Sequence, residues 1–139
     1  MNAKKERREV AAALQALPLL AAVPGKDVEA LAGAGRLLHL RAGWTIMAAD
    51  TPADSAYVVV DGTTCVRKGE VVLAHLGAGA VIGESALLEG RLRTATVSAE
   101  TDVTMLRIGY DELRPLLAAR PALQQAIQGE YDRKHLPVA

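Results

Sequence analysis

Gly83, Glu84 and Arg93 are residue types whose spacing in this chain could serve ligand chemistry. A glycine lets the backbone come close to a ligand. The start of the short helix that we expect over 84–89 would present unpaired N–H groups, which suit an anion. An arginine that folds back adds a planar fork matched to phosphate oxygens. Because a carboxylate cannot bind phosphate, Glu84 would accept hydrogen bonds from hydroxyls. This pattern predicts a site for a ligand that carries both a phosphate and sugar hydroxyls.

The middle of the chain has the texture of an antiparallel β structure. From Leu37 to Ile108, short runs of valine, leucine and threonine are divided by glycine and aspartate, which is typical of short strands. Asp61-Gly62 and Lys68-Gly69 are expected to be hairpin turns, since glycine takes the positive φ that such turns require. The eight predicted strands favour a barrel or jelly roll, and they lie near 37–41, 44–48, 56–60, 63–67, 71–76, 80–82, 94–99 and 102–108.

Helices are expected on both sides of these strands. An amphipathic helix over 4–16 should end or bend at Pro18, and 27–34 should form a second, shorter helix. After the strands, apolar residues return to helical spacing over 111–135, where Pro121 should divide two helices. No internal repeat is visible.

Composition excludes several classes of function. The 139 residues fit one domain, and their 16 basic and 16 acidic side chains give no net charge, which disfavours nucleic acid or an anionic membrane as a partner. The single cysteine, Cys65, cannot form an intrachain disulfide and fits a reducing, cytoplasmic compartment. The three histidines, His39, His75 and His135, lack metal-ligand spacing, and no nucleophile motif occurs. We therefore expect no metal site, no cofactor and no enzyme.

Two stretches carry a family resemblance. Gly79–Leu88 followed by Arg93–Ala99 resembles the phosphate-binding cassette of the cyclic nucleotide-binding domain family, and the upstream stretches 40–44 and 53–62 are similar to that family's first strands. The likeness runs from about Leu17 to about Leu117.

The resemblance implies a mainly β fold with flanking helices, an eight-stranded antiparallel β-roll of the jelly-roll (double-stranded β-helix) type. It implies a single domain over 1–139, with N-terminal helices over 4–34, the β-roll over 37–108 with its cassette at 79–99, and C-terminal helices over 111–135.

The resemblance also assigns roles in the cassette. It places Glu84 on the ribose 2′-hydroxyl and Arg93 on the cyclic phosphate, with Gly83 allowing close approach. The backbone N–H groups of Ser85 and Ala86 would bind the same phosphate. Ser85 departs from the family pattern, which usually has an aliphatic residue there, so its hydroxyl could bond the ligand or cap the helix. Leu92 also departs, because a proline often precedes the arginine.

Thr94 and the aromatic residues bear on the base. A threonine after the cassette arginine often accompanies acceptance of cyclic GMP, whereas alanine accompanies a preference for cyclic AMP; threonine is also simply a good strand residue. A lid over the base would have to come from Tyr57, Tyr110, Tyr131 or Trp44. Tyr131 on the last helix is the natural candidate, although a core position suits it equally, and Trp44 is expected in the core.

These observations predict a sensor module that binds a 3′,5′-cyclic nucleotide, cAMP or cGMP, and relays it through movement of the terminal helices. Only about 22 residues follow Leu117, so the effector is expected in another domain or a partner protein. An apolar terminal-helix face could also pair two copies. A first alternative is a domain that keeps the fold and binds no nucleotide, serving assembly. The weakest is an enzyme of the cupin or isomerase kind.

Overall fold

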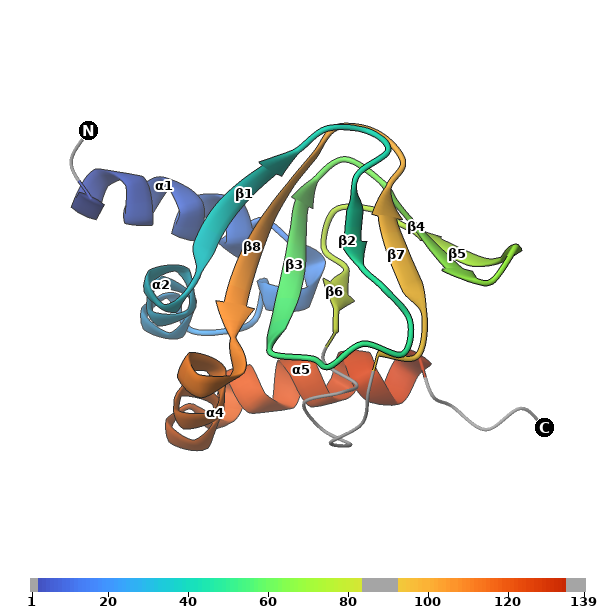
Figure 1. Cartoon of the computed structure of the whole chain (residues 1–139). Coiled ribbons are helices and arrows are strands. Elements are labelled where there is room, and N and C mark those ends of the chain that lie inside the picture. Colours follow the sequence, from blue (N-terminus) through green and yellow to red (C-terminus); the bar gives the residue numbers. More distant parts are fainter. Residues whose placement is uncertain (1–2, 84–92, 135–139) are drawn as a thin grey trace.

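Two four-stranded antiparallel sheets form the centre of the fold in the computed structural model, which describes residues 3–83 and 93–134. The first sheet has the order β1-β8-β3-β6 and the second has the order β2-β7-β4-β5 (Figure 1). The predicted eight-stranded antiparallel roll is thereby confirmed. The strands are β1 Arg36–Leu40, β2 Thr45–Met47, β3 Ser55–Asp61, β4 Thr64–Lys68, β5 Val71–Leu76, β6 Val81–Ile82, β7 Thr96–Ala99 and β8 Val103–Gly109.

Both predicted turns are present, but only the Lys68-Gly69 turn closes a hairpin, between β4 and β5. The prediction of a hairpin at Asp61-Gly62 was wrong, because β3 and β4 belong to different sheets and the turn carries the chain from one sheet to the other. Gly62 joins β3 to β4 with a φ of 94°, and Gly69 joins β4 to β5 with a φ of 63°. Residues with a Cβ rarely adopt such positive φ values, so glycine is favoured at both turns. The β4–β5 hairpin projects away from the rest of the roll (Figure 1).

Helices precede and follow the strands, close to the predicted ranges. They are α1 Ala3–Gln15, a 3₁₀ turn η1 Pro18–Leu20, α2 Gly25–Ala34, α4 Tyr110–Ala119 and α5 Pro121–Lys134. Pro18 opens η1 and Pro121 begins α5, because the fixed φ of proline suits a first helical position. In Figure 1, α5 runs along the foot of the roll, and α1 and α2 lie beside the first sheet.

The central strands of the first sheet, β8 and β3, bury side chains on both faces. On β3, Ala56 and Val58 pack against the helices, whereas Tyr57 and Val59 fill the space between the two sheets. The neighbouring strand β8 alternates in the same way. Period-two alternation therefore builds two hydrophobic clusters from the same strands, and the helices are held by the outer one.

The expectation that Trp44 belongs to the core was wrong. Its side chain is 62% exposed. It follows Gly43, which has a φ of 94°, and its N–H bonds the carbonyl of Arg41 at 3.2 Å, so it belongs to a turn before β2. Val71, Val72 and Leu73 on the edge strand β5 are also exposed. In the described part of the chain, every helix is too short or too polar to cross a membrane.

Candidate functional site

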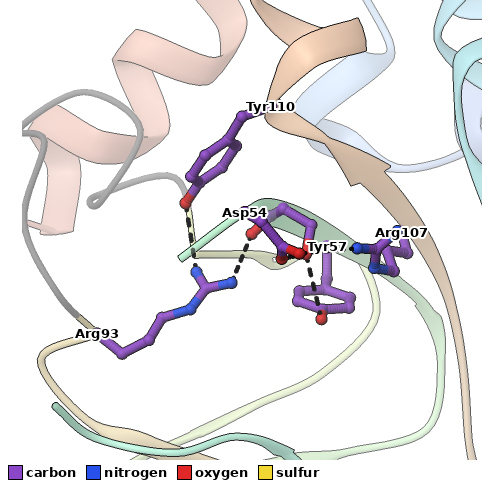
Figure 2. A network of polar contacts seen from close by, with 6 residues as sticks. Asp54, Tyr57, Arg93, Arg107 and Tyr110 are labelled. Carbon is purple, nitrogen blue, oxygen red and sulfur yellow. Dashed lines mark hydrogen bonds and ion pairs between the residues drawn. The ribbon is translucent and has the colours of Figure 1, made fainter. Parts of the chain in front are cut away.

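Four segments distant in the sequence meet at one end of the roll. Ser55 begins β3, and Gly83 follows β6. Arg93 lies just before β7, and Tyr110 begins α4. Figure 2 shows the side chain of Arg93 reaching toward Tyr110 and the start of β3. The fold thus gathers a guanidinium, two backbone carbonyls and a phenol.

The backbone of Arg93 is fixed by the loop that joins β2 to β3. Its N–H donates to the carbonyl of Thr51 at 2.9 Å, and its own carbonyl accepts from the N–H of Asp50 at 2.8 Å. Asp50 has a φ of 64°, a conformation that aspartate adopts more readily than most residues. These bonds set where the arginine side chain starts.

The guanidinium of Arg93 points into the protein and the residue is only 6% exposed. Its Nη2 donates to the carbonyl of Ser55 at 2.7 Å. Its Nη1 lies 3.3 Å from the hydroxyl of Tyr110 and 3.4 Å from the carbonyl of Gly83. The first of these bonds is short and the other two are long for an N–H donor, so the guanidinium is held firmly on one side only.

In the part of the chain that the structure describes, the charge of this buried guanidinium meets neutral acceptors. Within residues 3–83 and 93–134, no carboxylate forms an ion pair with Arg93. The acidic side chain of the neighbouring network, Asp54, instead pairs with Arg107 at 3.4 Å and lies 3.0 Å from the hydroxyl of Ser55 (Figure 2). A buried charge without a counter-charge is costly. The arrangement can therefore gain from an anion at Arg93.

Gly83 and Tyr110 complete the cradle around the guanidinium. Gly83 has a φ of 87°, and its carbonyl accepts from both Arg93 and the hydroxyl of Tyr110. The N–H of Tyr110 donates to the carbonyl of Asp54 at 2.7 Å. Through these bonds, α4, β3 and the end of β6 share one polar junction.

Two of the predicted ligand-binding residues, Gly83 and Arg93, are brought together. Glu84, Ser85 and Ala86 lie outside the described residues, as does the predicted helix over 84–89. Thr94 is exposed and precedes β7, which begins at Thr96, two residues later than predicted. Tyr131, the predicted lid, lies on α5 and is half-buried.

The part that Tyr110 plays at this junction was missed by the sequence reasoning, which counted it only among aromatic candidates for a lid. A signal was present, because it is one of three tyrosines and comes two residues after the last predicted strand. The other two acceptors of the Arg93 side chain gave no signal in the sequence, because they are the backbone carbonyls of Gly83 and Ser55. No triad of histidine, cysteine, aspartate or glutamate able to hold a metal ion occurs among the described residues.

Comparison with known proteins identifies the family of this chain. The family model for the cyclic nucleotide-binding domain matches residues 37–120. The regulatory subunit of a cAMP-dependent protein kinase from Aspergillus fumigatus is 31% identical over 138 residues, which cover 98% of this chain and 33% of that protein. An uncharacterised NTE-family protein from Mycobacterium bovis is 31% identical over 125 residues, covering 89% of this chain and 21% of that protein. The chain thus spans about a fifth to a third of these relatives.

The fold has solved counterparts. The PKAR CBD2 structure with bound Sp-2Cl-cAMPS superposes with a TM-score of 0.78 at 18% identity, covering 98% of this chain and 96% of that one. At this identity the likeness concerns the fold. The family assignment rests on residues 37–120, which the family model matches. They contain α4 and all eight described strands apart from Arg36, the first residue of β1. The chain belongs to the cyclic nucleotide-binding domain family.

Proposed function

We propose that this chain is a regulatory sensor module that binds a 3′,5′-cyclic nucleotide at the end of the roll where Arg93 lies. The observation that carries the proposal is the buried guanidinium of Arg93, which has three neutral oxygen acceptors and no carboxylate partner among the described residues. A cyclic phosphate supplies one negative charge in a compact group, which suits this position. Two similar proteins, the regulatory subunit of a cAMP-dependent protein kinase and PKAR CBD2 with bound Sp-2Cl-cAMPS, support the same ligand class.

The proposed roles follow the family pattern onto this sequence. Arg93 holds the phosphate together with the backbone N–H groups of Ser85 and Ala86, and Glu84 accepts from the ribose hydroxyl. Gly83, whose positive φ glycine adopts more readily than any residue with a side chain, lets the chain turn at the ligand. The base would then lie toward Thr94, with Tyr131 as its cover. Both cAMP and cGMP are candidates.

Arg93 can supply a large part of the binding free energy. A hydrogen bond to a charged group contributes about 1.5–3 kcal/mol, and micromolar binding requires about 8 kcal/mol. Two such bonds to a phosphate would thus account for roughly half of it. Binding can act on an effector only through contacts that differ between two states of the protein. We place that effector in an attached domain or a separate partner, and we assign no catalytic step to this chain.

Calorimetry with cAMP and cGMP tests the proposal. The wild-type chain should bind at least one of them saturably, and Arg93→Gln should weaken that binding by about 100-fold or more, equivalent to about 2.7 kcal/mol. Arg67→Gln is the matched control, because Arg67 is an exposed arginine on β4. It removes the same charge and should change the affinity less than about twofold. Equal losses in the two variants would contradict a specific role for Arg93.

One observation favours a second function, a domain that keeps the fold but binds no nucleotide. The guanidinium of Arg93 already donates to Ser55, Gly83 and Tyr110, so it is hydrogen-bonded without a ligand. In that case Arg93 would be a structural residue. Folded wild-type protein that gives no heat with either nucleotide, together with a large loss of stability in Arg93→Gln, would support this function.

A further inference from the structure

Tyr110 makes bonds from both its backbone and its side chain at the junction around Arg93. Its N–H donates to the carbonyl of Asp54 at 2.7 Å, and Asp54 immediately precedes β3. Its hydroxyl donates to the carbonyl of Gly83 and accepts from Nη1 of Arg93 at 3.3 Å. The residue is 5% exposed, so its ring is fixed by packing as well. One residue therefore ties α4 to β3, to the end of β6 and to the arginine.

The hydroxyl of Tyr110 contacts the side of the Arg93 guanidinium that Ser55 does not hold. Nη2 is held by a short bond to Ser55, whereas the partners of Nη1 among the described residues are the Tyr110 hydroxyl and the Gly83 carbonyl, at 3.3 and 3.4 Å. The Gly83 carbonyl is itself oriented by the same hydroxyl. Without the phenol oxygen, Nη1 would keep one long bond, and the plane of the guanidinium could rotate about its Ser55 contact.

Tyr110 is also the first residue of α4. Arg114, one helical turn later, places its Cζ 5.4 Å from the centroid of the Tyr110 ring, within the range of a cation–π contact. A change in the position of the ring therefore acts on the first turn of the helix directly. This is a physical link between the guanidinium and a terminal helix.

We infer that Tyr110 is a positioning residue for the anionic group of the ligand, holding Arg93 in the orientation that a phosphate requires and joining that arginine to α4. The inference rests on the proposed function, since it deepens the role given to Arg93. It assigns no ligand contact to Tyr110 itself. Its action is on the guanidinium.

Tyr110→Phe removes only the hydroxyl and tests this role. Calorimetry with cAMP and cGMP should show about three- to tenfold weaker binding than wild type, the effect of losing one hydrogen bond to a charged group. Tyr57→Phe is the matched control, because its hydroxyl accepts from Ser55 Oγ at 3.4 Å in the same network, whereas the Arg93 side chain donates to Gly83, Tyr110 and the Ser55 carbonyl among the described residues. That variant should bind within about twofold of wild type.

A second readout needs no ligand. The side-chain Nε–H resonance of Arg93, followed by nitrogen-15 NMR, should shift in Tyr110→Phe and stay in place in Tyr57→Phe. A residue that served stability alone would change the midpoint of thermal unfolding and leave this resonance unmoved.

The outcomes separate the two proposals. If the wild-type chain binds neither nucleotide, the proposed function fails and the inference falls with it. If the wild type binds and Tyr110→Phe binds equally or more tightly, the proposed function stands and the role of Tyr110 is overturned. Weaker binding without a shift of the Arg93 resonance also overturns it, because the effect would then reach the ligand by another route.

Discussion

The guanidinium of Arg93 occupies the space that a side chain at Gly83 would need. A Cβ built on Gly83 would lie 2.5 Å from Nη1 of Arg93 and 3.1 Å from the carbonyl oxygen of Ser55. Atoms at such a separation must move apart. The absence of a side chain at Gly83 is therefore what allows the buried guanidinium its present position, in addition to allowing the positive φ of 87°.

Gly83→Ala should consequently harm both stability and binding. The positive φ costs an L-residue about 1–2 kcal/mol, and displacing the arginine adds to this, for a total of about 2–4 kcal/mol. Because the guanidinium must move, the affinity for the cyclic nucleotide should fall as well. Urea denaturation and calorimetry on the same preparation measure the two effects.

Gly69→Ala separates the two causes. Gly69 also has a positive φ, 63°, but a Cβ there would meet no atom within 4 Å. This variant should lose about 1 kcal/mol of stability and bind the nucleotide as the wild type does. Normal binding in Gly83→Ala would show that Arg93 is not confined by this contact.

A second prediction concerns the ion pair between Asp27 and Arg120. Asp27 lies in the first turn of α2, Arg120 lies between α4 and α5, and their Oδ1 and Nη1 atoms are 2.6 Å apart. The side chains are 13% and 34% exposed, so solvent screens the pair only in part. A double-mutant cycle with Asp27→Asn and Arg120→Gln should give a coupling free energy of about 1–2 kcal/mol in urea denaturation.

The pair between Asp54 and Arg107 provides the comparison. It is longer, at 3.4 Å, and its side chains are 81% and 39% exposed. The same cycle there should give less than about 0.5 kcal/mol, as is usual for exposed ion pairs. Equal coupling in the two cycles would mean that the Asp27–Arg120 pair does not hold α2 to the C-terminal helices.

The strands and the turns between them were predictable because their signals are local. Runs of apolar residues mark β3 and β8, and a glycine with positive φ marks the turn after β3, at Gly62, and the β4–β5 hairpin, at Gly69. That the turn at Gly62 leads into the other sheet depends on strand pairing between distant residues, which has no local signal. The proximity of Gly83 and Arg93 was predictable only through the family resemblance. Neither composition nor periodicity predicts that the guanidinium of Arg93 contacts the carbonyl of Gly83, ten positions earlier.

The environment of Arg93 could not be read from the sequence. The carbonyl of Ser55 is 38 positions away and the hydroxyl of Tyr110 is 17 positions away, and a backbone carbonyl has the same chemistry in every residue. Its use as an acceptor depends on where the folded chain leaves it unpaired. The prediction that Trp44 is buried failed for a related reason. Hydrophobicity predicts burial, but the turn at Gly43 determines the direction of the next side chain.

The last prediction concerns the choice of base through Thr94. Thr94 is exposed and adjacent to Arg93, so its hydroxyl is available to a ligand held by that arginine. If the hydroxyl accepts from the exocyclic amine of guanine, Thr94→Ala should weaken cGMP binding about three- to tenfold and leave cAMP binding within about twofold. Thr94→Ser keeps the hydroxyl and should retain the wild-type ratio of the two affinities. If Thr94→Ala changed the affinities for both nucleotides equally, the prediction would be contradicted. Only a contact with the base can distinguish guanine from adenine, so Thr94 would then have no contact with the base.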